Sequence, residues 1–398
     1  MKLLSVEEAR ARMLAGVVAL GVEQVGLREA LGRVLAADVF AARDQPPFAA
    51  SAMDGWAVRA ADGPGRLRIV GESAAGRGFA GAVEAGEAVR IFTGAAVPAG
   101  ADAVVIQEEV ARDGDFVVIP GVTQPRHIRP AGQDFRAGAL LLAAGTRLDP
   151  WRLSLIAAAG MAKAPVARAP KVAILSTGEE IVEPGGAPGP FQIFNSGTTA
   201  LGALVATWGG EALVLESVGD EAAATARAVA DAACDLIVTI GGASVGDHDL
   251  VKPALASLGL ELIVESVAVR PGKPTWFGVL ADGRRVLGLP GNPASALVCA
   301  ELFLHPLLAA LQGADPALRL FAARARGAFA ANGPREEWTR ARLIHGADGA
   351  LVAQRLADQD SSLVSVFADA DALVRRPPGA GAVQPGETIE VLTLGRLS

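Results

Sequence analysis

The sequence predicts a multidomain α/β protein with a central α/β domain, an inserted β-rich domain, a helical linker domain and a small C-terminal β barrel. Strand and helix patterns alternate over residues 169–317, which indicates a mostly parallel sheet covered by helices. Short Val- and Ile-rich runs separated by turns fill residues 45–145 and return after residue 318. A chain of 398 residues is also long for a single core, so we expect about two to four domains.

Helical patterns stand on both sides of the first β-rich stretch. Ser5 and Glu8 have the spacing of a capping box, so a helix is expected over residues 5–20. Further helical stretches are expected near residues 27–36 and 150–163. The β-rich stretch between them therefore looks like an insertion.

These patterns predict four domains. Residues 1–44 and 146–168 together form the helical linker domain. Residues 45–145 form the inserted β-rich domain, and residues 169–317 form the α/β domain. The remaining residues, 318–398, form a small β barrel or sandwich.

The composition narrows the class of protein. A net charge of −7 argues against a nucleic-acid partner. No uncharged apolar run is long enough for a membrane span, and the N-terminus turns acidic at once, unlike a secretory signal. Cys234 and Cys299 make no disulfide framework. We therefore expect a soluble cytoplasmic protein without a membrane or nucleic-acid partner.

The most informative stretch lies in the middle of the α/β domain. An apolar strand over residues 236–240 runs into the glycine-rich turn 241–246, and Asp247 and Asp249 follow. Such a turn lets backbone N–H groups approach a phosphate, and the next helix adds the positive end of its dipole. Carboxylates at this position can hold Mg²⁺. An ordinary tight turn between strand and helix explains the stretch equally well.

Polar residues also follow the other predicted strands. Ser176-Thr-Gly-Glu-Glu180, Asp220, Arg270-Pro-Gly-Lys-Pro274 and Pro290-Gly-Asn-Pro-Ala-Ser295 each come directly after a strand. Because ligands bind at the carboxyl ends of strands in open α/β sheets, we expect these loops to share one site. For a single loop, turn formation or helix-end charge is the alternative.

The chemistry of these loops indicates a phosphorylated ligand and a divalent metal. Glu180, Asp220 and Asp249 offer the hard oxygen ligands that such a metal prefers. Arg270 and Lys273, placed between prolines, are candidates for binding an oxyanion.

Three stretches of the inserted domain have turn chemistry when each is considered alone. They are Ser51-Ala-Met-Asp-Gly-Trp-Ala-Val-Arg59, the segment Phe92-Thr-Gly-Ala-Ala-Val-Pro98 and the mixed-charge segment 126–134. The first two of these stretches, together with the strand-end loops, resemble the molybdopterin molybdenumtransferases, the MoeA family, which is related to the gephyrin E domain. The resemblance runs along nearly the whole chain, with the motifs in family order.

The resemblance implies an enzyme of molybdenum cofactor synthesis. Such an enzyme takes adenylylated molybdopterin and molybdate, inserts the metal with the help of Mg²⁺, and releases AMP. It also implies a homodimer whose active site is shared between the α/β domain of one subunit and the inserted domain of the other. Molybdopterin adenylyltransferase, molybdoenzymes and the chaperones of molybdoenzymes are the protein partners it suggests.

The resemblance also implies roles for individual residues. The implied catalytic residues are Asp54, Thr93, Glu180, Asp220 and Asp249, and Asp220 and Asp249 are also the implied metal ligands. The implied substrate-binding residues are Arg129, Asp134, Ser176, Thr177, Gly178, Gly241, Gly242, Ser244, Gly246, Pro290, Gly291, Asn292 and Pro293. The implied molybdate-binding residues are Arg270, Lys273, Pro274, Ser295, Arg340 and Ser361. Asp54, Thr93, Arg129 and Asp134 would come from the partner subunit.

Two residues depart from the family pattern. Arg270 stands where many relatives have lysine, so a planar fork replaces a point charge. Trp56 stands where tyrosine is usual, and the chain has no tyrosine at all. The sequence does not choose between molybdate and tungstate, which are tetrahedral dianions of similar size.

Two other functions compete with the transferase. The first is a nucleotidyltransferase related to the molybdopterin adenylyltransferases, whose α/β domain looks similar, but the insertion at 45–145 argues against it. The second is a non-catalytic scaffold of the gephyrin type. The presence of Asp54, Glu180, Asp220 and Asp249 favours catalysis over scaffolding.

Overall fold

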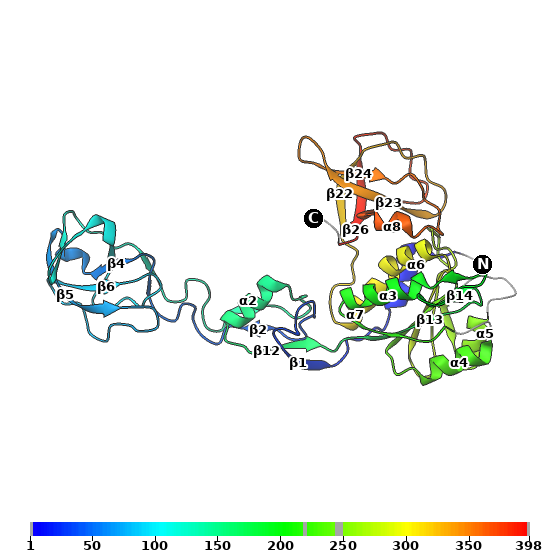
Figure 1. Cartoon of the computed structure of the whole chain (residues 1–398), viewed down its shortest axis with the longest axis horizontal. Coiled ribbons are helices and arrows are strands. Elements are labelled where there is room, and N and C mark those ends of the chain that lie inside the picture. The colour runs from blue at the N-terminus through cyan, green and yellow to red at the C-terminus, as the bar shows by residue number, and fades with distance from the viewer. Residues whose placement is uncertain (1–2, 218–220, 243–249, 396–398) are drawn as a thin grey trace.

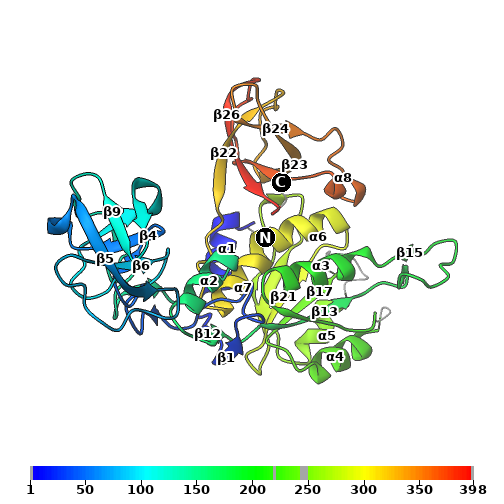
Figure 2. The same cartoon turned by 60° about the vertical axis from the view of Figure 1, so that its left-hand side comes forward.

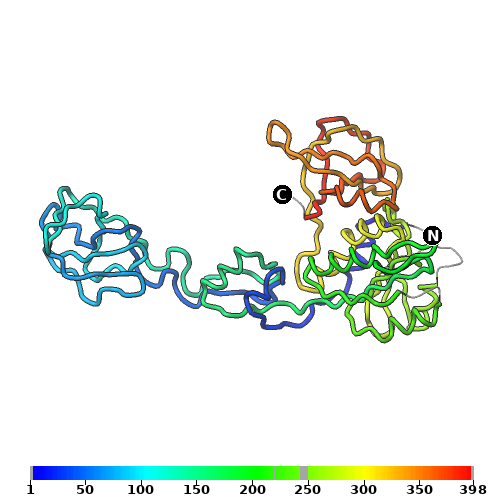
Figure 3. The backbone as a smooth tube through the Cα atoms, in the orientation of Figure 1, coloured from blue at the N-terminus to red at the C-terminus, as the bar shows by residue number. Residues whose placement is uncertain are grey.

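The computed structural model describes residues 3–217, 221–242 and 250–395. The molecule is elongated, with the α/β domain and the C-terminal β domain at one end and the inserted β-rich domain at the other (Figure 1). A small middle lobe lies between them. The chain passes through this lobe twice, once on its way out to the inserted domain and once on its return (Figure 3). This arrangement agrees with the predicted multidomain α/β fold class.

The α/β domain is built on a mixed, mostly parallel sheet. Its strand order is β16-β13-β17-β21-β20-β18, with bounds β13 (Lys171–Ser176), β16 (Glu211–Val214), β17 (Leu236–Ile240), β18 (Glu261–Val264), β20 (Trp276–Val279) and β21 (Arg285–Leu289). β20 pairs antiparallel with both β21 and β18, so the carboxyl ends of the other strands share one edge. The sequence pattern did not predict β20.

Both faces of this sheet are covered, which explains the continuous apolar runs of its central strands. In β13, Val172 and Ile174 pack into one hydrophobic cluster, whereas Ala173 and Leu175 pack into a second. The helices of the α/β domain are α3 (Ser196–Thr207), α4 (Ala222–Asp231), α5 (Val251–Ala256), α6 (Pro293–Cys299) and α7 (His305–Leu311). Residues of α3, α6 and α7 join the first cluster, and residues of α4 and α5 join the second.

The N-terminal helix α1 (Val6–Leu14) begins with the predicted capping box, because Ser5 and Glu8 bind each other's backbone N–H groups. Its buried face, which includes Ala9 and Met13, belongs to the first cluster of the α/β domain. The domain limits remain predictions, but this helix packs on the α/β domain rather than in a separate linker domain.

The long apolar helix of the α/β domain is a core element. A π-helical turn, Ala300–Leu304, joins α6 to α7, so one helical rod spans Pro293–Leu311. This rod is long and apolar enough to cross a membrane, yet 83% of the tested stretch is buried inside the protein. Burial of this extent is what a helix in the core of a large domain shows.

The π-helical turn carries a buried carboxyl group. Burial raises the pKa of Glu301 to about 7, and burial, with a smaller effect of Arg147, lowers the pKa of His305 to about 4. Glu301 Oε2 lies 3.8 Å from His305 Nδ1, and the His305 ring stacks on Trp208 with centroids 4.7 Å apart. His305 is therefore uncharged at neutral pH, so this contact is not an ion pair, whereas Glu301 titrates in the neutral range.

Glu301→Gln should stabilise the protein at alkaline pH. Because the folded-state pKa lies above the unfolded value, the wild type loses stability as pH rises from about 4.5 to about 7. A pKa shift of this size lowers the free energy of unfolding by roughly 3 kcal/mol once Glu301 is ionised. Glutamine stays neutral, so the melting temperature of Glu301→Gln should exceed that of the wild type at pH 8, with little difference at pH 4.5. An equal difference at both pH values would show that titration of Glu301 is not the cause.

The C-terminal domain is a closed five-stranded barrel, as predicted. Its strands are β22 (Leu320–Ala325), β23 (Glu336–His345), β24 (Leu351–Arg355), β25 (Ala372–Arg376) and β26 (Thr388–Thr393), and a short helix α8 (Ser365–Ala368) precedes β25. The barrel closes because β23 pairs with both β24 and β25. β19 (Val269–Arg270), from the α/β domain, adds to β23 in parallel.

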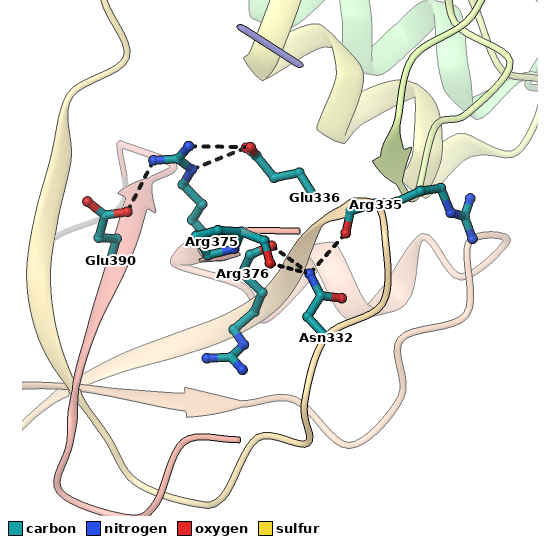
Figure 4. A network of polar contacts seen from close by, with 7 residues as sticks. Asn332, Arg335, Glu336, Arg375, Arg376 and Glu390 are labelled. Atoms are coloured by element: carbon teal, nitrogen blue, oxygen red, sulfur yellow. Dashed lines mark hydrogen bonds and ion pairs between the residues drawn. The ribbon is translucent and has the colours of Figure 1, made fainter. Parts of the chain in front are cut away.

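A polar network fixes the start of β23 (Figure 4). The Arg375 guanidinium binds both carboxylate oxygens of Glu336 at 3.2 and 3.3 Å and reaches Glu390 at 3.2 Å. Asn332 Nδ2 donates to the carbonyl oxygens of Arg335 and Arg376, at 2.9 and 2.8 Å. The segment that carries Arg335 is therefore held on both sides before it enters the strand.

The inserted domain is a six-stranded sheet with the order β7-β4-β6-β5-β9-β8. Its strands are β4 (Gly55–Val58), β5 (Gly65–Ser73), β6 (Glu87–Ile91), β7 (Ala103–Ile106), β8 (Ala111–Asp113) and β9 (Phe116–Ile119). A separate pair, β3 (Ala50–Ser51) with β10 (Ile128–Arg129), and the 3₁₀ turns Ala60–Asp62 and Gln107–Glu109 complete it.

The middle lobe is less helical than the sequence predicts. It contains one α-helix among its described residues, α2 (Pro150–Ala158), and two strand pairs. The pairs are β1 (Val22–Gly26) with β12 (Lys163–Ala167) and β2 (Val39–Phe40) with β11 (Leu140–Leu142). The predicted helix over residues 27–36 is wrong, because Leu35 bridges to Val166 and Arg33 binds the carbonyl of Ala167 instead.

Candidate active site

A cavity of about 1160 Å³ lies where the α/β domain meets the C-terminal barrel. Its lining comes from the carboxyl ends of β13, β17 and β21, from the loop after β18, and from β23 and the segment that follows β24. The predicted site residues that line it are Ser176, Thr177, Gly178, Glu180, Gly241, Gly242, Arg270, Lys273, Pro274, Pro290, Gly291, Asn292, Pro293, Ser295, Arg340 and Ser361. The loops after the predicted strands therefore meet at one edge of the sheet.

Glycine turns form the middle of the cavity. Gly241 follows β17 with a φ of +88°, and a side chain there would approach the carbonyl oxygen of Thr177 to within 2.9 Å. The turns after β13 and β17 thus touch through bare backbone, which leaves room for a ligand to approach closely. Ser244, Gly246, Asp220 and Asp249 lie outside the described residues, so their predicted roles stay predictions.

No group of three His, Cys, Asp or Glu side chains suited to a metal ion occurs among the residues that the structure describes. Glu180 does line the cavity. The two predicted metal ligands, Asp220 and Asp249, belong to the segments that are not described.

A cationic loop forms the opposite flank of the cavity from β13. Arg270 and Lys273 both line the cavity, and the Arg270 side chain, 64% exposed, has its Nε 3.6 Å from a carboxylate oxygen of Glu337. Beneath the loop, the buried Thr275 hydroxyl donates to the carbonyl of Gly272 at 2.8 Å and lies 3.1 Å from the sulfur of Cys299. The loop is thus braced from inside the domain.

Gly272→Ala should weaken binding of the oxyanion. Gly272 has a φ of +116°, and a methyl group there would lie 2.1 Å from the Cys299 sulfur. The loop must shift to relieve this clash, and Arg270 and Lys273 must shift with it. We titrate the oxyanion molybdate and follow the rise in melting temperature that it causes. The molybdate concentration that gives half of the maximal rise should increase at least about tenfold in Gly272→Ala. Gly283→Ala serves as a control for a glycine with positive φ, since it has open space around it. If Gly272→Ala and Gly283→Ala weakened anion binding equally, the packing of Gly272 on Cys299 would not be what positions the loop.

Arg340 is the buried cation of the site. It is 1% exposed, its Nη2 donates to the carbonyl of Asp360 at 2.9 Å, and its Nε has no partner among the described residues. Gln359 binds both the backbone N–H and the carbonyl of Arg340. Burial lowers the pKa of Arg340, but a guanidinium remains charged in proteins. The Arg340 guanidinium, with an N–H donor that has no partner among the described residues, is therefore suited to bind an anion in the cavity.

The loop that follows β24 is tied to the α/β domain. Asn292 Nδ2 donates to the Ser361 hydroxyl at 3.0 Å, and the Ala294 N–H donates to the carbonyl of Ser361 at 3.1 Å. The predicted residues Asn292 and Ser361 are thus in direct contact across the two domains.

Sequence reasoning missed several charged residues of the barrel that line the cavity, namely Arg335, Glu337, Arg355 and Asp360. The signal for two of them is visible in hindsight. Arg335 and Glu337 stand two residues apart at the start of a strand, so they share a face, while Glu336 points to the opposite side. The described charged residues of the cavity comprise Arg270, Lys273, Arg335, Arg340 and Arg355 against Glu180, Glu337 and Asp360. The described lining of the cavity therefore carries more cations than anions, in a chain of net charge −7.

A second group of predicted residues lies in the inserted domain. The backbone N–H and the hydroxyl of Thr93 both donate to Asp54 Oδ1, at 2.7 and 2.8 Å. These hydrogen bonds, the backbone one first, lower the pKa of Asp54. Nearby, the Arg90 guanidinium lies 5.3 Å from the ring centroid of Trp56 and 4.8 Å from that of Phe92. Asp54 is thus held ionised beside a cation.

The inserted-domain residues do not meet the cavity within one chain. Arg129 lies on β10, opposite Ala50, and Asp134 donates its backbone N–H to the carbonyl of Gln45. Asp54 directly precedes β4 and Thr93 closely follows β6. These strands belong to the inserted domain at the far end of the elongated molecule, and the turned view keeps that domain apart from the α/β domain (Figures 1 and 2). Within the one chain that the structure describes, Asp54 and Thr93 form no joint site with the cavity.

Comparisons with known proteins cover almost the whole chain. Residues 4–160 match the MoeA N-terminal region (domain I and II), residues 173–310 match a probable molybdopterin binding domain, and residues 322–394 match the MoeA C-terminal region (domain IV). A molybdopterin molybdenumtransferase of Haemophilus influenzae is 34% identical, with 98% of both chains covered. The chain belongs to the MoeA family. The predicted family and fold class are thereby confirmed.

Further relatives agree with this assignment. A molybdopterin molybdenumtransferase of Bacillus subtilis is 34% identical over 94% of this chain and 90% of its own length. The solved structure of a molybdopterin biosynthesis MoeA protein from Pyrococcus horikoshii superposes with a TM-score of 0.85 at 28% identity, covering 98% of this chain and 100% of that one. The inserted domain and the barrel are thus part of the architecture shared with these relatives. This argues against the alternative of an adenylyltransferase, which resembles the α/β domain alone.

Proposed function

We propose that this MoeA-family chain inserts molybdenum from molybdate into adenylylated molybdopterin and releases AMP. The observation that carries the proposal is the cavity at the strand ends, where glycine turns adjoin a braced cationic loop and the buried Arg340. The full-length family relationship supports it. A phosphorylated ligand fits the glycine turns, and a tetrahedral dianion fits the cations.

The proposed roles follow from chemistry and position. Arg270, Lys273 and Arg340 bind the molybdate oxygens through charge-assisted hydrogen bonds, which are stronger than neutral ones. Because the Thr275–Cys299 brace fixes the loop, these donors need little rearrangement when the anion arrives. Glu180 lines the cavity as a carboxylate on the β13 side, where it can accept a proton or bind a cation.

We also propose that Mg²⁺ takes part, held by Asp220 and Asp249. Both side chains are hard oxygen ligands of the kind that Mg²⁺ prefers. When bound, the ion neutralises phosphate charge. None of the steps assigned to described residues depends on it.

We propose further that the active unit is a homodimer, in which Asp54 and Thr93 of one subunit face the cavity of the other. The support is their mutual hydrogen bonding far from the cavity of their own chain. We place the protein in the cytoplasm, with molybdopterin adenylyltransferase as the supplier of the substrate and molybdoenzymes or their chaperones as recipients of the product.

The decisive experiment incubates the purified chain with adenylylated molybdopterin, molybdate and Mg²⁺ and measures AMP. We expect AMP release that depends on molybdate. Omission of molybdate and replacement by sulfate, another tetrahedral dianion, are the controls. AMP release that proceeds equally without molybdate would show a hydrolase, and no AMP release under any condition would refute the transferase assignment.

A further inference from the structure

A short parallel strand pair with exposed apolar side chains, the β14–β15 segment, borders the cavity on the β13 side. It consists of β14 (Ile181–Val182) and β15 (Ile193–Phe194), which pair in parallel and are joined by a loop rich in glycine and proline. Ile181, Ile193 and Phe194 line the cavity, although the side chains of Ile193 and Phe194 are 58% and 49% exposed. Figure 2 shows the β14–β15 segment projecting from the α/β domain.

The base of the β14–β15 segment is held by hydrogen bonds. The Ile193 N–H donates to the carbonyl of Glu180 at 2.7 Å, and the Asn195 N–H donates to the carbonyl of Val182 at 2.8 Å. The Asn195 side chain donates to Glu183 at 2.7 Å and also accepts from the Thr198 N–H as the cap of α3. Phe194 is therefore an aromatic side chain presented at a cavity wall from a fixed backbone.

The sheet topology separates this apolar wall from the cations. The β14–β15 segment follows β13, near one edge of the sheet, whereas the loop with Arg270 and Lys273 follows β18, the strand at the other edge. The glycine turns of β17 and the loop after β21 lie between them. A ligand that fills the cavity thus meets aromatic and aliphatic surface at one end, bare backbone in the middle and cations at the other end.

We propose that Phe194 is the stacking platform for a planar, fused-ring nitrogen heterocycle of the ligand, with Ile181 and Ile193 covering the ring edge. Exposed aromatic faces at a ligand cavity are used in this way because a ring gains stacking energy on them without needing a hydrogen-bond pattern. This inference rests on the proposed function for the identity of the ligand, since adenylylated molybdopterin carries two fused-ring nitrogen heterocycles, a planar purine and a pterin that keeps a planar pyrimidine ring.

The test measures binding rather than turnover. AMP and pterin-6-carboxylate are titrated separately into the full-length wild type, Phe194→Ala, Phe194→Leu and Phe194→Trp, and the dissociation constants are measured by calorimetry. Phe191→Ala is the matched control, because Phe191 lies in the loop that joins β14 to β15, is 91% exposed and is absent from the described lining of the cavity.

Phe194→Ala should raise the Kd of one of the two probes about 5- to 100-fold. Phe194→Leu should recover only part of the affinity, since it restores apolar area without a π face. Phe194→Trp should bind like the wild type, and its emission should change when the ring is added. Whichever probe is affected identifies the ring that stacks here. Molybdate binding should not change in any of these variants.

Equal affinities of wild type and Phe194→Ala for both probes would overturn the inference. It is also overturned if Phe194→Ala changes the mass measured by light scattering together with the Kd, because the apolar wall would then be a subunit contact. A wild type that binds a ring through Phe194 but releases no AMP would refute the proposed function while leaving the platform standing.

Discussion

Asp54→Ala should abolish AMP release, although Asp54 lies at the opposite end of the chain from the cavity (Figure 1). In the proposed dimer, this carboxylate enters the active site of the other subunit. Its two hydrogen bonds from Thr93 keep it ionised and fixed in direction. We expect a loss of at least about a hundredfold in AMP release at saturating substrates, with an unchanged melting temperature. Undiminished turnover in Asp54→Ala would remove the inserted domain from the mechanism.

Mixing two inactive variants tests whether the site is shared. Asp54→Ala mixed with Glu180→Ala should regain activity, because a heterodimer contains one site with both residues intact. With free exchange of equal amounts, about a quarter of the wild-type sites are restored. Asp54→Ala mixed with Thr93→Ala is the control, since both changes damage the same half of the site and should not complement. Failure of the first mixture, with subunit exchange shown by labelled chains, would place the whole site within one chain.

The parts of the site that could be predicted share a local cause. Loops such as 176–180 and 270–274 combine glycine or proline with charged residues directly after apolar strands. Because parallel strands place their carboxyl ends at one edge, local patterns were sufficient to bring these loops together. The continuous apolar runs of β13 and β17 likewise predicted a sheet buried on both faces.

The parts that could not be predicted depend on packing between domains. Arg335 and Arg355 reach the cavity because the barrel packs on the α/β domain, with Trp338 in the same hydrophobic cluster as Phe303 of the π-helical turn. No pattern within the barrel sequence reports this contact. The helix predicted at 27–36 failed for a similar reason, since pairing with distant residues, such as Leu35 with Val166, outweighed local helical preference.

The two arginines predicted to bind the oxyanion differ in their surroundings. Arg270 is exposed and is partly neutralised by Glu337, 3.6 Å away. Arg340 is buried, and its Nε has no partner among the residues that the structure describes. A hydrogen bond to a charged group gains strength when water is excluded from it. Arg340 should therefore contribute more to molybdate binding than Arg270.

Arg340→Met should raise the molybdate concentration for half-maximal AMP release about 10- to 100-fold, since a lost charge-assisted bond costs about 1.5–3 kcal/mol. Methionine keeps an unbranched apolar side chain at this buried position, so the barrel should still fold. Arg270→Ala should have a smaller effect, and Arg340→Lys an intermediate one because it keeps the charge without the fork.

Arg342→Ala is the control, because Arg342 is on the same strand but binds Asp369 instead of lining the cavity. Bound molybdate should raise the melting temperature of the wild type and of Arg342→Ala, but not that of Arg340→Met at the same concentration. A thermal shift of equal size in Arg340→Met would mean that the anion binds elsewhere, and the cations at this end of the cavity would then belong to the phosphates of the nucleotide.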